Sequence, residues 1–397
     1  GRPEAAYLLE RVIDVAAQEM DIDPLDLRQR NFIREFPYRN ALGMLVDCGA
    51  FASNLALASE QAGLTGFADR RTKSKKAGQA RGRGISSYLE VTLGGPTDET
   101  EIRFDDDGGV TMLVGSASTG QGHETAYRQI VYEELGIAPD KVRYIQGDTG
   151  LMASGGGHGG SRSLKIVGSA LFNTTLEVRD KGLKAAAHIL EAPEKDIEFK
   201  AGVFAVAGTN HQIGILDLEA ALRTASDLPE DVPATLTSKA RFERQAFSFP
   251  NGVHIAEVEV DPDTGHVALE RYTVVDDFGR IINPMIAEGQ VAGGAVQGIG
   301  QAMLEGVVYD ADGQLISGSF MDYAMPRADD LSAIDVTFNQ DQPTKTNPLG
   351  VKGAGEAGAT GAPPAIVNAV VDALKDYGVK HIDMPLTPEK VWRAVHG

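Results

Sequence analysis

Residues 258–275 read VEVDPDTGHVALERYTVV, and this stretch decides the fold prediction. Val258 and Val260 flank a glutamate, and a second apolar run, Val267–Val275, follows the interruption at Asp261–Gly265. Two apolar runs separated by a turn rich in Asp, Pro and Gly are typical of a β-hairpin. Downstream, residues 284–304 are rich in Gly, Ala and Gln and predict a helix. We therefore expect a hairpin followed by a helix in this part of the chain.

The same order of hairpin and helix occurs earlier in the chain. Ile102–Phe104 and Val110–Val114 predict a hairpin across an Asp- and Gly-rich turn. The sequence then predicts a helix over residues 124–135 that ends at Gly136. It also predicts a strand over Val142–Gln146 and a long helix over residues 161–190. Near the C-terminus we expect a hairpin turn at Asp310–Gly313 and helices over residues 364–377 and 388–395.

These patterns predict an α+β fold built from two similar-sized hairpin-plus-helix units. A helical pair precedes them, because Leu8, Leu9, Val12, Ala16 and Met20 follow Pro3 at helical spacing. The run Arg70–Arg83 carries seven basic residues and no acid, and we interpret it as a solvated linker. The predicted divisions are residues 1–80 (lead-in and linker), 81–240 (subdomain A) and 241–397 (subdomain B).

Composition excludes several classes of function. The 37 basic and 56 acidic residues give a net charge of −19, which argues against nucleic acid or an anionic membrane as the main partner. Cys48, the single cysteine, forms no internal disulfide and cannot hold an iron–sulfur cluster alone. The longest uncharged stretch, Gly289–Leu304, is too short and too polar to span a bilayer. No signal peptide opens the chain, and we expect a cytoplasmic protein.

Three loops concentrate glycine beside a few polar side chains: residues 120–124, 155–162 and 353–361. Glycine lets a backbone approach a ligand closely and present its N–H groups. The first two loops lead into predicted helices, whose N-termini favour phosphate. One such loop is most simply a connection between elements, but three predict an anionic cofactor that is held mainly by the backbone.

Other short motifs are weaker. Gly353–Gly358 matches G-x-G-x-x-G, but the polar, proline-broken segment before it is no buried strand, so a nucleotide-dependent enzyme is only an alternative. Asp277-Phe278-Gly279 lacks the loops that accompany a kinase metal triplet. His123-Glu124 resembles half of a zinc motif without its second histidine, so we expect no metal held directly by protein side chains.

Two side chains are candidates for chemistry. Glu356 is a lone carboxylate among small residues, and in an enclosed site desolvation would raise its pKa toward that of a general base. Gln297 lies in a glycine-rich helix, where a buried amide needs hydrogen-bond partners, and we expect it to meet a polar ligand as readily as the core.

Together these motifs resemble the molybdenum-binding large subunit of the xanthine oxidase family, which includes aerobic carbon monoxide dehydrogenase and aldehyde oxidase. The resemblance rests on five segments in the family's order: Gly1–Ala5 with Arg30–Ile33, Gly120–Glu124, Gly159–Ser163, Val296–Gly300, and Asn347–Glu356 with Gly361–Pro364. It covers nearly the whole chain and implies a molybdopterin-binding domain.

The resemblance also implies roles for residues. Glu356 matches the catalytic glutamate that removes the proton of a metal-bound hydroxyl. The residues that match the family's cofactor-binding positions are Gln121, Gly122, His123, Glu124, Gly160, Ser161, Arg162, Gln297 and Gly355. The implied cofactor is molybdenum–molybdopterin, in its cytosine dinucleotide form. The implied reaction oxidises an aldehyde, an N-heterocycle or carbon monoxide with oxygen derived from water.

A full subunit of this family is about twice as long as this chain. The resemblance therefore implies an N-terminal half or a split partner chain, with [2Fe–2S] and FAD subunits in a dimer of heteromers. Substrate identity and the presence of copper stay open, because the loop that distinguishes them lies outside these residues. A non-catalytic scaffold that keeps the fold without molybdenum is the alternative.

Overall fold

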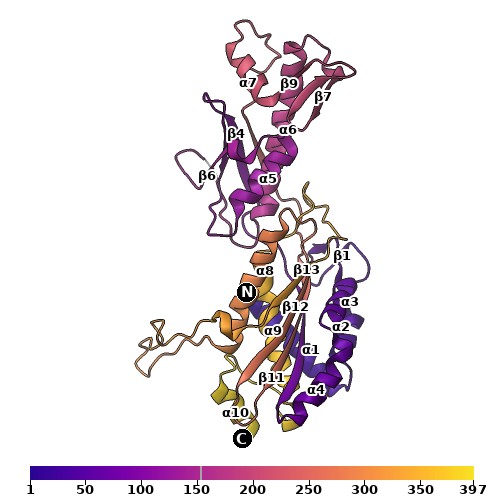
Figure 1. The fold of residues 1–397 in the computed structure, drawn as a ribbon, viewed down its shortest axis with the longest axis vertical. Coiled ribbons are helices and arrows are strands. Elements are labelled where there is room, and N and C mark those ends of the chain that lie inside the picture. Colours follow the sequence, from indigo (N-terminus) through magenta and orange to yellow (C-terminus); the bar gives the residue numbers. More distant parts are fainter. Residues whose placement is uncertain (153) are drawn as a thin grey trace. The chain divides into compact units, whose positions relative to one another are not determined.

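The hairpin predicted at residues 258–275 is present and lies at the centre of a four-stranded sheet (Figure 1). Its strands are antiparallel, with Val260 opposite Val267 and a bulge between Glu257 and Val258. Gly265 in the turn has φ +75°, a left-handed conformation that glycine adopts without strain. The sheet has the order β13-β12-β11-β3, with strands β3 (Ala80–Leu89), β11 (Asn251–Val260), β12 (Val267–Asp277) and β13 (Ile334–Phe338).

The computed structural model describes residues 1–152 and 154–397, which divide into two units. Unit 1 comprises Gly1–Val91, Ser248–Pro343 and Ala354–Gly397, and unit 2 comprises Thr92–Phe247 and Thr344–Gly353. Each unit contains helices and a mixed sheet, so the predicted α+β class is confirmed. The units are not the predicted continuous segments, because each is assembled from separate stretches of chain.

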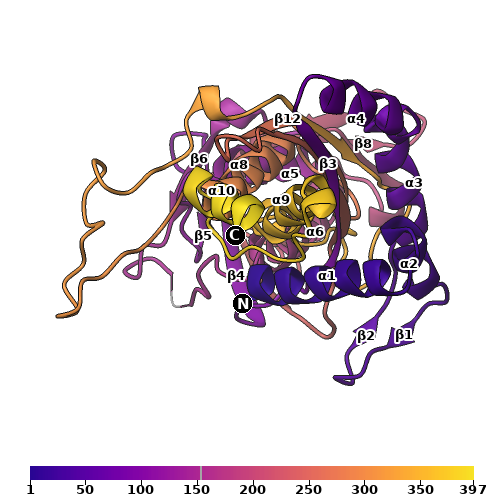
Figure 2. The same cartoon turned by 90° about the horizontal axis from the view of Figure 1, so that it is seen from below.

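Helices cover both faces of the unit 1 sheet. On one face α9 (Ala357–Ala373) packs on β3 and β11 and beside α8 (Pro284–Met303), as Figures 1 and 2 show. On the other face α3 (Phe51–Gln61) packs on β11 and β12. Strand β11 is consequently buried along almost its whole length. Unit 1 also contains β1 (Tyr38–Arg39), β2 (Leu45–Val46) and α10 (Pro388–His396).

The predicted linker at residues 70–83 is wrong. Most of these residues belong to two elements of unit 1, α4 (Phe67–Lys76) and β3. Two of the positive charges are used inside the protein, because Arg70 and Arg81 both form ion pairs with the buried Glu257 on β11. Glycines of β3 let α9 lie directly on the strand, since a Cβ at Gly84 would come within 2.0 Å of a backbone carbonyl oxygen of α9.

The predicted helical pair is present as α1 (Arg2–Glu19) and α2 (Pro24–Asn31), but α1 buries a polar face. The fully enclosed Arg28 donates to Glu10 at 2.8 Å and to Asp14 at 3.0 Å. The apolar side chains at helical spacing point outward instead, and Leu9 is 60% exposed and Val12 58% exposed. Helical spacing therefore predicted the helix correctly, although the apolar side chains are not its buried face.

Unit 2 repeats the connectivity of unit 1. The hairpin of β4 (Thr97–Phe104) and β5 (Val110–Val114) leads into α5 (His123–Leu135), and then into a strand parallel to β5, β6 (Val142–Gln146). In unit 1 the hairpin of β11 and β12 leads into α8 and then into β13, which is parallel to β12. In each unit a glycine-rich loop and a long helix follow, α6 (Ser163–Ile189) in unit 2 and α9 in unit 1.

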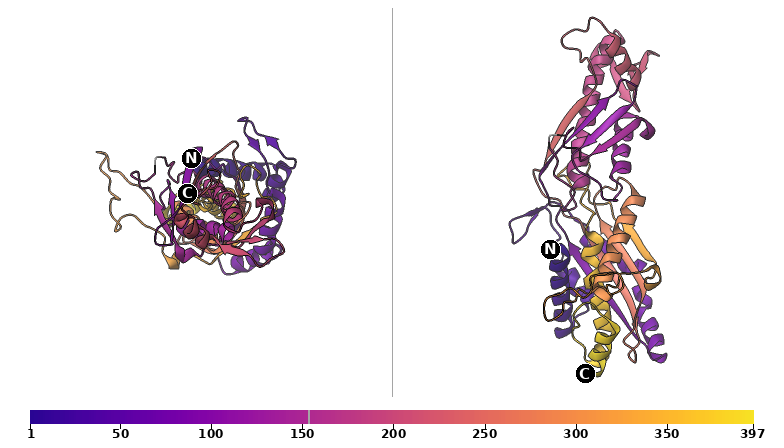
Figure 3. Two further views of the ribbon diagram at one scale, coloured as in Figure 1. Left: turned by 90° about the horizontal axis from the view of Figure 1, so that it is seen from above. Right: turned by 90° about the vertical axis from the view of Figure 1, so that its left-hand side faces the viewer.

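The rest of unit 2 is attached to α6. Strand β10 (Ser238–Glu243) completes the order β10-β4-β5-β6, and a three-stranded sheet with one helix extends from α6, as seen at the right of Figure 3. These elements are β7 (Ile197–Lys200), β8 (Val203–Val206), β9 (Gln212–Gly214) and α7 (Ile215–Thr224). Residues 344–353, late in the chain, also belong to unit 2. There Leu349 lies over Gly168 of α6, and Gly353 N–H donates to Thr92.

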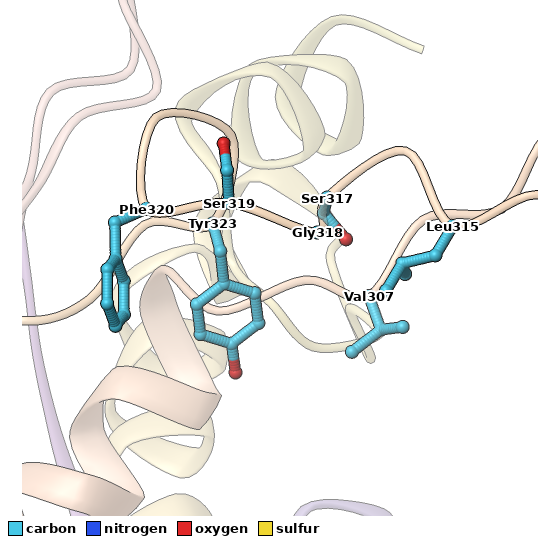
Figure 4. Close-up of a pocket in the computed structure, with 7 residues that line it drawn as sticks. All are labelled: Val307, Leu315, Ser317, Gly318, Ser319, Phe320 and Tyr323. Carbon is cyan, nitrogen blue, oxygen red and sulfur yellow. The ribbon is translucent and has the colours of Figure 1, made fainter.

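A long segment between α8 and β13 projects from unit 1 (Figures 1 and 2). The predicted turn at Asp310–Gly313 is present, but a single bridge between Tyr309 and Leu315 replaces the predicted hairpin strands. Residues of this segment line a cavity of about 340 Å³, drawn in Figure 4. None of the predicted site residues lines this cavity.

Candidate functional site

The loop that connects β5 to α5 carries Gln121 and Gly122. Gly122 has φ +73° and ends the loop in a left-handed conformation immediately before the helix. The Gln121 side-chain oxygen accepts hydrogen bonds from Thr119 N–H at 2.5 Å and from Ser118 Oγ at 3.1 Å. Because the oxygen is used within the loop, the side-chain NH₂ group is what Gln121 can offer to a ligand.

His123 is the first residue of α5, and its ring stacks on Tyr127 one turn later, with centroids 5.5 Å apart. Burial and the neighbouring His158 lower the pKa of His123 to about 4. The imidazole is therefore neutral at pH 7. Its Nδ1 atom is buried and has no hydrogen-bond partner among the described residues, so it can either donate to or accept from a ligand.

Glu124 has a different environment. Its carboxylate is exposed and pairs with Arg128 at 2.9 Å, one turn along the same helix. A carboxylate in the first turn also interacts favourably with the helix dipole. The geometry thus gives Glu124 a role in stabilising α5.

The second predicted loop of unit 2 ends in a strained turn. Gly160 has φ +79° and Ser161 has φ +56°, which is uncommon for a residue with a side chain. Helix α6 then begins at Ser163, two residues after the predicted start. The Gly160 carbonyl accepts a hydrogen bond from Leu93 N–H at 2.9 Å, which ties this turn to the start of unit 2.

Arg162 lies entirely inside the protein. Its guanidinium pairs with the equally buried Asp98 at 3.0 Å and donates to the carbonyl oxygens of Gly95 at 2.9 Å and Thr97 at 2.7 Å. These bonds hold residues 95–98 against the start of α6. The geometry therefore gives Arg162 the task of shaping the loop, and leaves backbone N–H groups as what the turn can present to a ligand.

Buried polar atoms without hydrogen-bond partners gather around these two loops. In the described part of unit 2, the buried side-chain atoms without a hydrogen-bond partner are Ser116 Oγ, His123 Nδ1, Tyr127 OH and Ser163 Oγ. Tyr127 links the group, since it stacks on His123 and lies near enough to Ser116 and Arg162 for both to influence its pKa. Buried polar groups are normally hydrogen-bonded, so this cluster needs a polar ligand or ordered water. A pterin, whose ring edge carries several donors and acceptors, fits this requirement.

In unit 1, Gln297 lies on α8, and the prediction of a buried amide is wrong because this residue is exposed. The small residues near it are used for packing. A Cβ at Gly298 would lie 2.8 Å from side-chain atoms of Ala362 and Pro363, so α8 and α9 are in close contact there. Gln297 is therefore available to a ligand.

Gly355 and Glu356 form the entry to α9, which begins several residues before the predicted position. Glu356 is half-buried at the N-cap, and its side chain makes no capping hydrogen bond. Its carbonyl oxygen accepts from Thr360 N–H at 3.0 Å and Thr360 Oγ1 at 2.8 Å. The carbonyl oxygen of Gly355 accepts from Gln290 Nε2 at 2.9 Å.

The structure thus gathers the predicted residues into two sets. Residues 121–124 and 160–162 adjoin within unit 2, and Gln297, Gly355 and Glu356 lie on neighbouring helices of unit 1. Sequence reasoning missed Asp98, Tyr127 and Gln290. A helical projection offered a signal for Gln290 alone, because it lies seven residues before Gln297 and so on the same face of α8.

The described residues contain no group of three or more His, Cys, Asp or Glu side chains placed to hold a metal ion. Across the same residues, no helix combines the length and apolar character needed to cross a bilayer.

Comparison with known proteins decides the family. Residues 57–332 match the molybdopterin cofactor-binding domain. This chain belongs to that family. The predicted resemblance is confirmed, and the carbon monoxide dehydrogenase and xanthine dehydrogenase relatives predicted from the motifs are among the matches.

Known proteins match the whole length of this chain. This chain is 33% identical to the 6-hydroxypseudooxynicotine dehydrogenase complex subunit gamma of Paenarthrobacter nicotinovorans, over 100% of this chain and 51% of that protein. It is 32% identical to the carbon monoxide dehydrogenase large chain of Hydrogenophaga pseudoflava, over 99% and 51%. The structure of reconstituted CO dehydrogenase from Oligotropha carboxidovorans superimposes with a TM-score of 0.94 at 32% identity, over 100% and 51%. The chain spans about half the length of these relatives.

Proposed function

We propose that this chain is the cofactor-binding part of a molybdenum hydroxylase in which Glu356 acts as the general base. The observation that best supports a bound pterin is the cluster of buried, unpartnered polar atoms at Ser116, His123, Tyr127 and Ser163. Such atoms are costly unless a ligand or water pairs with them. In the scaffold alternative, only ordered water would pair with these atoms.

Residue roles follow from the contacts. Gln121, Gly122, His123, Gly160 and Ser161 would hold the pterin and its phosphate-bearing tail, a cytosine dinucleotide in this proposal, through side-chain and backbone N–H groups. In unit 1, the exposed amide of Gln297 and the backbone of Gly355 are the groups that we propose for cofactor binding. Glu124 and Arg162 support these loops rather than touching the cofactor. The bound cofactor supplies two-electron redox chemistry.

Glu356 would perform the proton transfer. Its carboxylate accepts the proton from the water-derived hydroxyl that adds to an electrophilic carbon of the substrate. The hydrogen bonds to the carbonyl oxygens of Gly355 and Glu356 hold the backbone on both sides of this carboxylate. A general base is effective only when it is held within hydrogen-bond reach of the proton that it takes.

Substrate and partners are proposed at the level of class. The relatives' names point to an N-heterocycle such as nicotine or to carbon monoxide, and an aldehyde also fits the chemistry. With Cys48 as its single cysteine, the chain needs partner subunits to carry electrons away through [2Fe–2S] clusters and FAD. We propose a cytoplasmic dimer of heteromers that includes the other half of the molybdenum subunit.

Replacement of Glu356 with Gln in the assembled enzyme tests this proposal. The amide keeps the shape of the side chain but cannot take a proton, so turnover should fall by at least about 10³-fold with whichever of an aldehyde, an N-heterocycle or carbon monoxide the unsubstituted enzyme oxidises. Molybdenum content and pterin fluorescence after oxidation should match the unsubstituted enzyme. Full activity of the variant would refute the role of Glu356, and an unsubstituted complex without molybdenum or pterin would support the scaffold alternative.

A further inference from the structure

Gln290 lies on α8 directly beside the entry to α9. Its side chain is partly buried, and its Nε2 donates to the carbonyl oxygen of Gly355 at 2.9 Å. Gly355 immediately precedes the proposed base. The hydrogen bond therefore joins a rigid helix to the peptide group from which Glu356 starts.

The helices at this point are in backbone contact. A Cβ at Gly358 would lie 2.3 Å from the backbone nitrogen of Ala295, and one at Gly294 would lie 3.1 Å from Gly358 Cα. Gln290 is one turn before Gly294 on the same face of α8. Because the two backbones touch, α8 is a fixed platform for the loop that leads to Glu356.

The loop itself has little intrinsic rigidity. Glycine reaches many more backbone conformations than other residues, and Gly353 and Gly355 both precede Glu356. The exposed Gly355 peptide could rotate if nothing held its carbonyl group. Downstream, Thr360 already fixes the Glu356 carbonyl through two hydrogen bonds. Gln290 supplies the matching restraint upstream, so the Cα–Cβ direction of Glu356 is defined from both sides.

We propose that Gln290 is a positioning residue for the Glu356 carboxylate. This inference rests on the proposed function, in which Glu356 is the base. Gln290 acts through the Gly355 carbonyl. Neither the composition nor the glycine-rich motif indicates this role. A misplacement of about 1 Å at a reacting group can lower a rate by about 100-fold.

Replacement of Gln290 with Met or with Glu in the assembled enzyme tests the inference, because both variants lose the donor while keeping the length of the side chain. We expect kcat to fall about 10-fold to 100-fold, with KM within twofold, unchanged molybdenum and pterin content, and an unchanged melting temperature. Gln301→Met, a change at an exposed glutamine about three turns further along α8, is the control and should leave kcat unchanged. Unchanged kcat in the Gln290 variants, or a loss of cofactor content, would overturn the inference.

Hydrogen exchange on the assembled enzyme gives an independent readout. Backbone amides of residues 355–361 should exchange faster in both Gln290 variants than in the parent and the Gln301 variant. Equal exchange rates would overturn the restraint that we infer. If Glu356→Gln retained full activity, the proposed function would fail, while the exchange measurement would still report on Gln290. The two failures are therefore distinguishable.

Discussion

Arg162 is completely buried and charged, so its partners decide its role. Its pairing with Asp98 and with three backbone carbonyl groups satisfies the guanidinium within the protein. A comparison of motifs assigns Arg162 to the binding loop, because the arginine lies within the matched segment Gly159–Ser163. Only the side-chain geometry separates a residue that shapes the loop from one that touches a ligand.

The surroundings of Gln121 and Gln297 likewise could not be predicted from the sequence. Both were predicted from sequence as cofactor-binding residues, and both have an amide that can reach a ligand. The sequence could not show that the Gln121 oxygen is already used by Thr119, or that Gln297 is exposed, because both depend on loop and helix orientation. The spacing of seven residues places Gln290 on the same face of α8 as Gln297, but it could not show that Gln290 donates to the Gly355 carbonyl.

The low pKa of His123 predicts a pH-dependent stability of unit 2. Burial lowers this pKa from its ordinary value of 6.5 to about 4. Between those pH values the unfolded chain binds a proton that the folded chain does not, so the free energy of unfolding decreases as the pH falls from 6.5 toward 4. The slope for one proton is at most about 1.4 kcal/mol per pH unit. Urea titrations of the cofactor-free chain at several pH values measure it.

The matched variants for this prediction are His123→Gln and His211→Gln. The first removes the buried imidazole and should flatten the dependence of stability on pH between about 4 and 6.5. The second replaces an exposed histidine of the same unit and should leave the dependence unchanged. Identical slopes for the parent and the His123 variant would contradict the prediction.

At the scale of elements, both units use one connectivity. A hairpin, a helix, a parallel strand, a glycine-rich loop and a long helix follow one another in each unit. The proposed cofactor residues lie at corresponding places, since Gly160–Arg162 precede α6 and Gly355–Glu356 precede α9. Hairpins and helices could be predicted because alternation and turn residues are local signals.

The linker interpretation of residues 70–83 was wrong for a physical reason. A run of positive charge normally indicates a solvated segment, but here opposing carboxylates come from β11, β12 and α9, far away in the sequence. Gly82 and Gly84 likewise serve close packing of α9 on β3. Pairing between distant segments leaves no signal within the segment itself.

Neighbouring glycines of α8 give a prediction about helix packing. A Cβ at Gly293 would meet nothing within 4 Å, whereas one at Gly294 would press on the backbone of α9 at 3.1 Å. Gly293→Ala should stabilise unit 1 by about 0.5–1 kcal/mol through helix propensity. Gly294→Ala should destabilise it by about 1–3 kcal/mol because the helices must separate. Guanidinium titrations of both variants measure the difference, and effects of the same sign would contradict it.

At the scale of the whole molecule, the surface carries apolar side chains that the chain does not cover. Leu8, Leu9 and Val12 are exposed on α1, and Phe320 and Met321 are exposed on the segment that projects from unit 1. Exposed apolar patches of this kind are typical of proteins that assemble with others. This agrees with relatives of about twice the length.

The exposed face of α1 predicts a neutral effect on stability. Leu9→Gln with Val12→Gln should change the free energy of unfolding by no more than about 0.5 kcal/mol, and should reduce binding of a hydrophobic dye. Ala17→Gln, a change on the buried face of the same helix, should destabilise the chain strongly. A large loss of stability in the double variant would show that these side chains are buried in the folded chain.

The return of residues 344–353 to unit 2 has a practical consequence. Leu349 and Gly353 complete that unit after the chain has built most of unit 1. Neither unit is therefore encoded by one contiguous gene fragment, and a shortened version that stops at residue 343 would remove Leu349 from its place over Gly168 of α6. Any dissection of this protein into separately expressed units must splice three distant stretches together for unit 1 and two for unit 2.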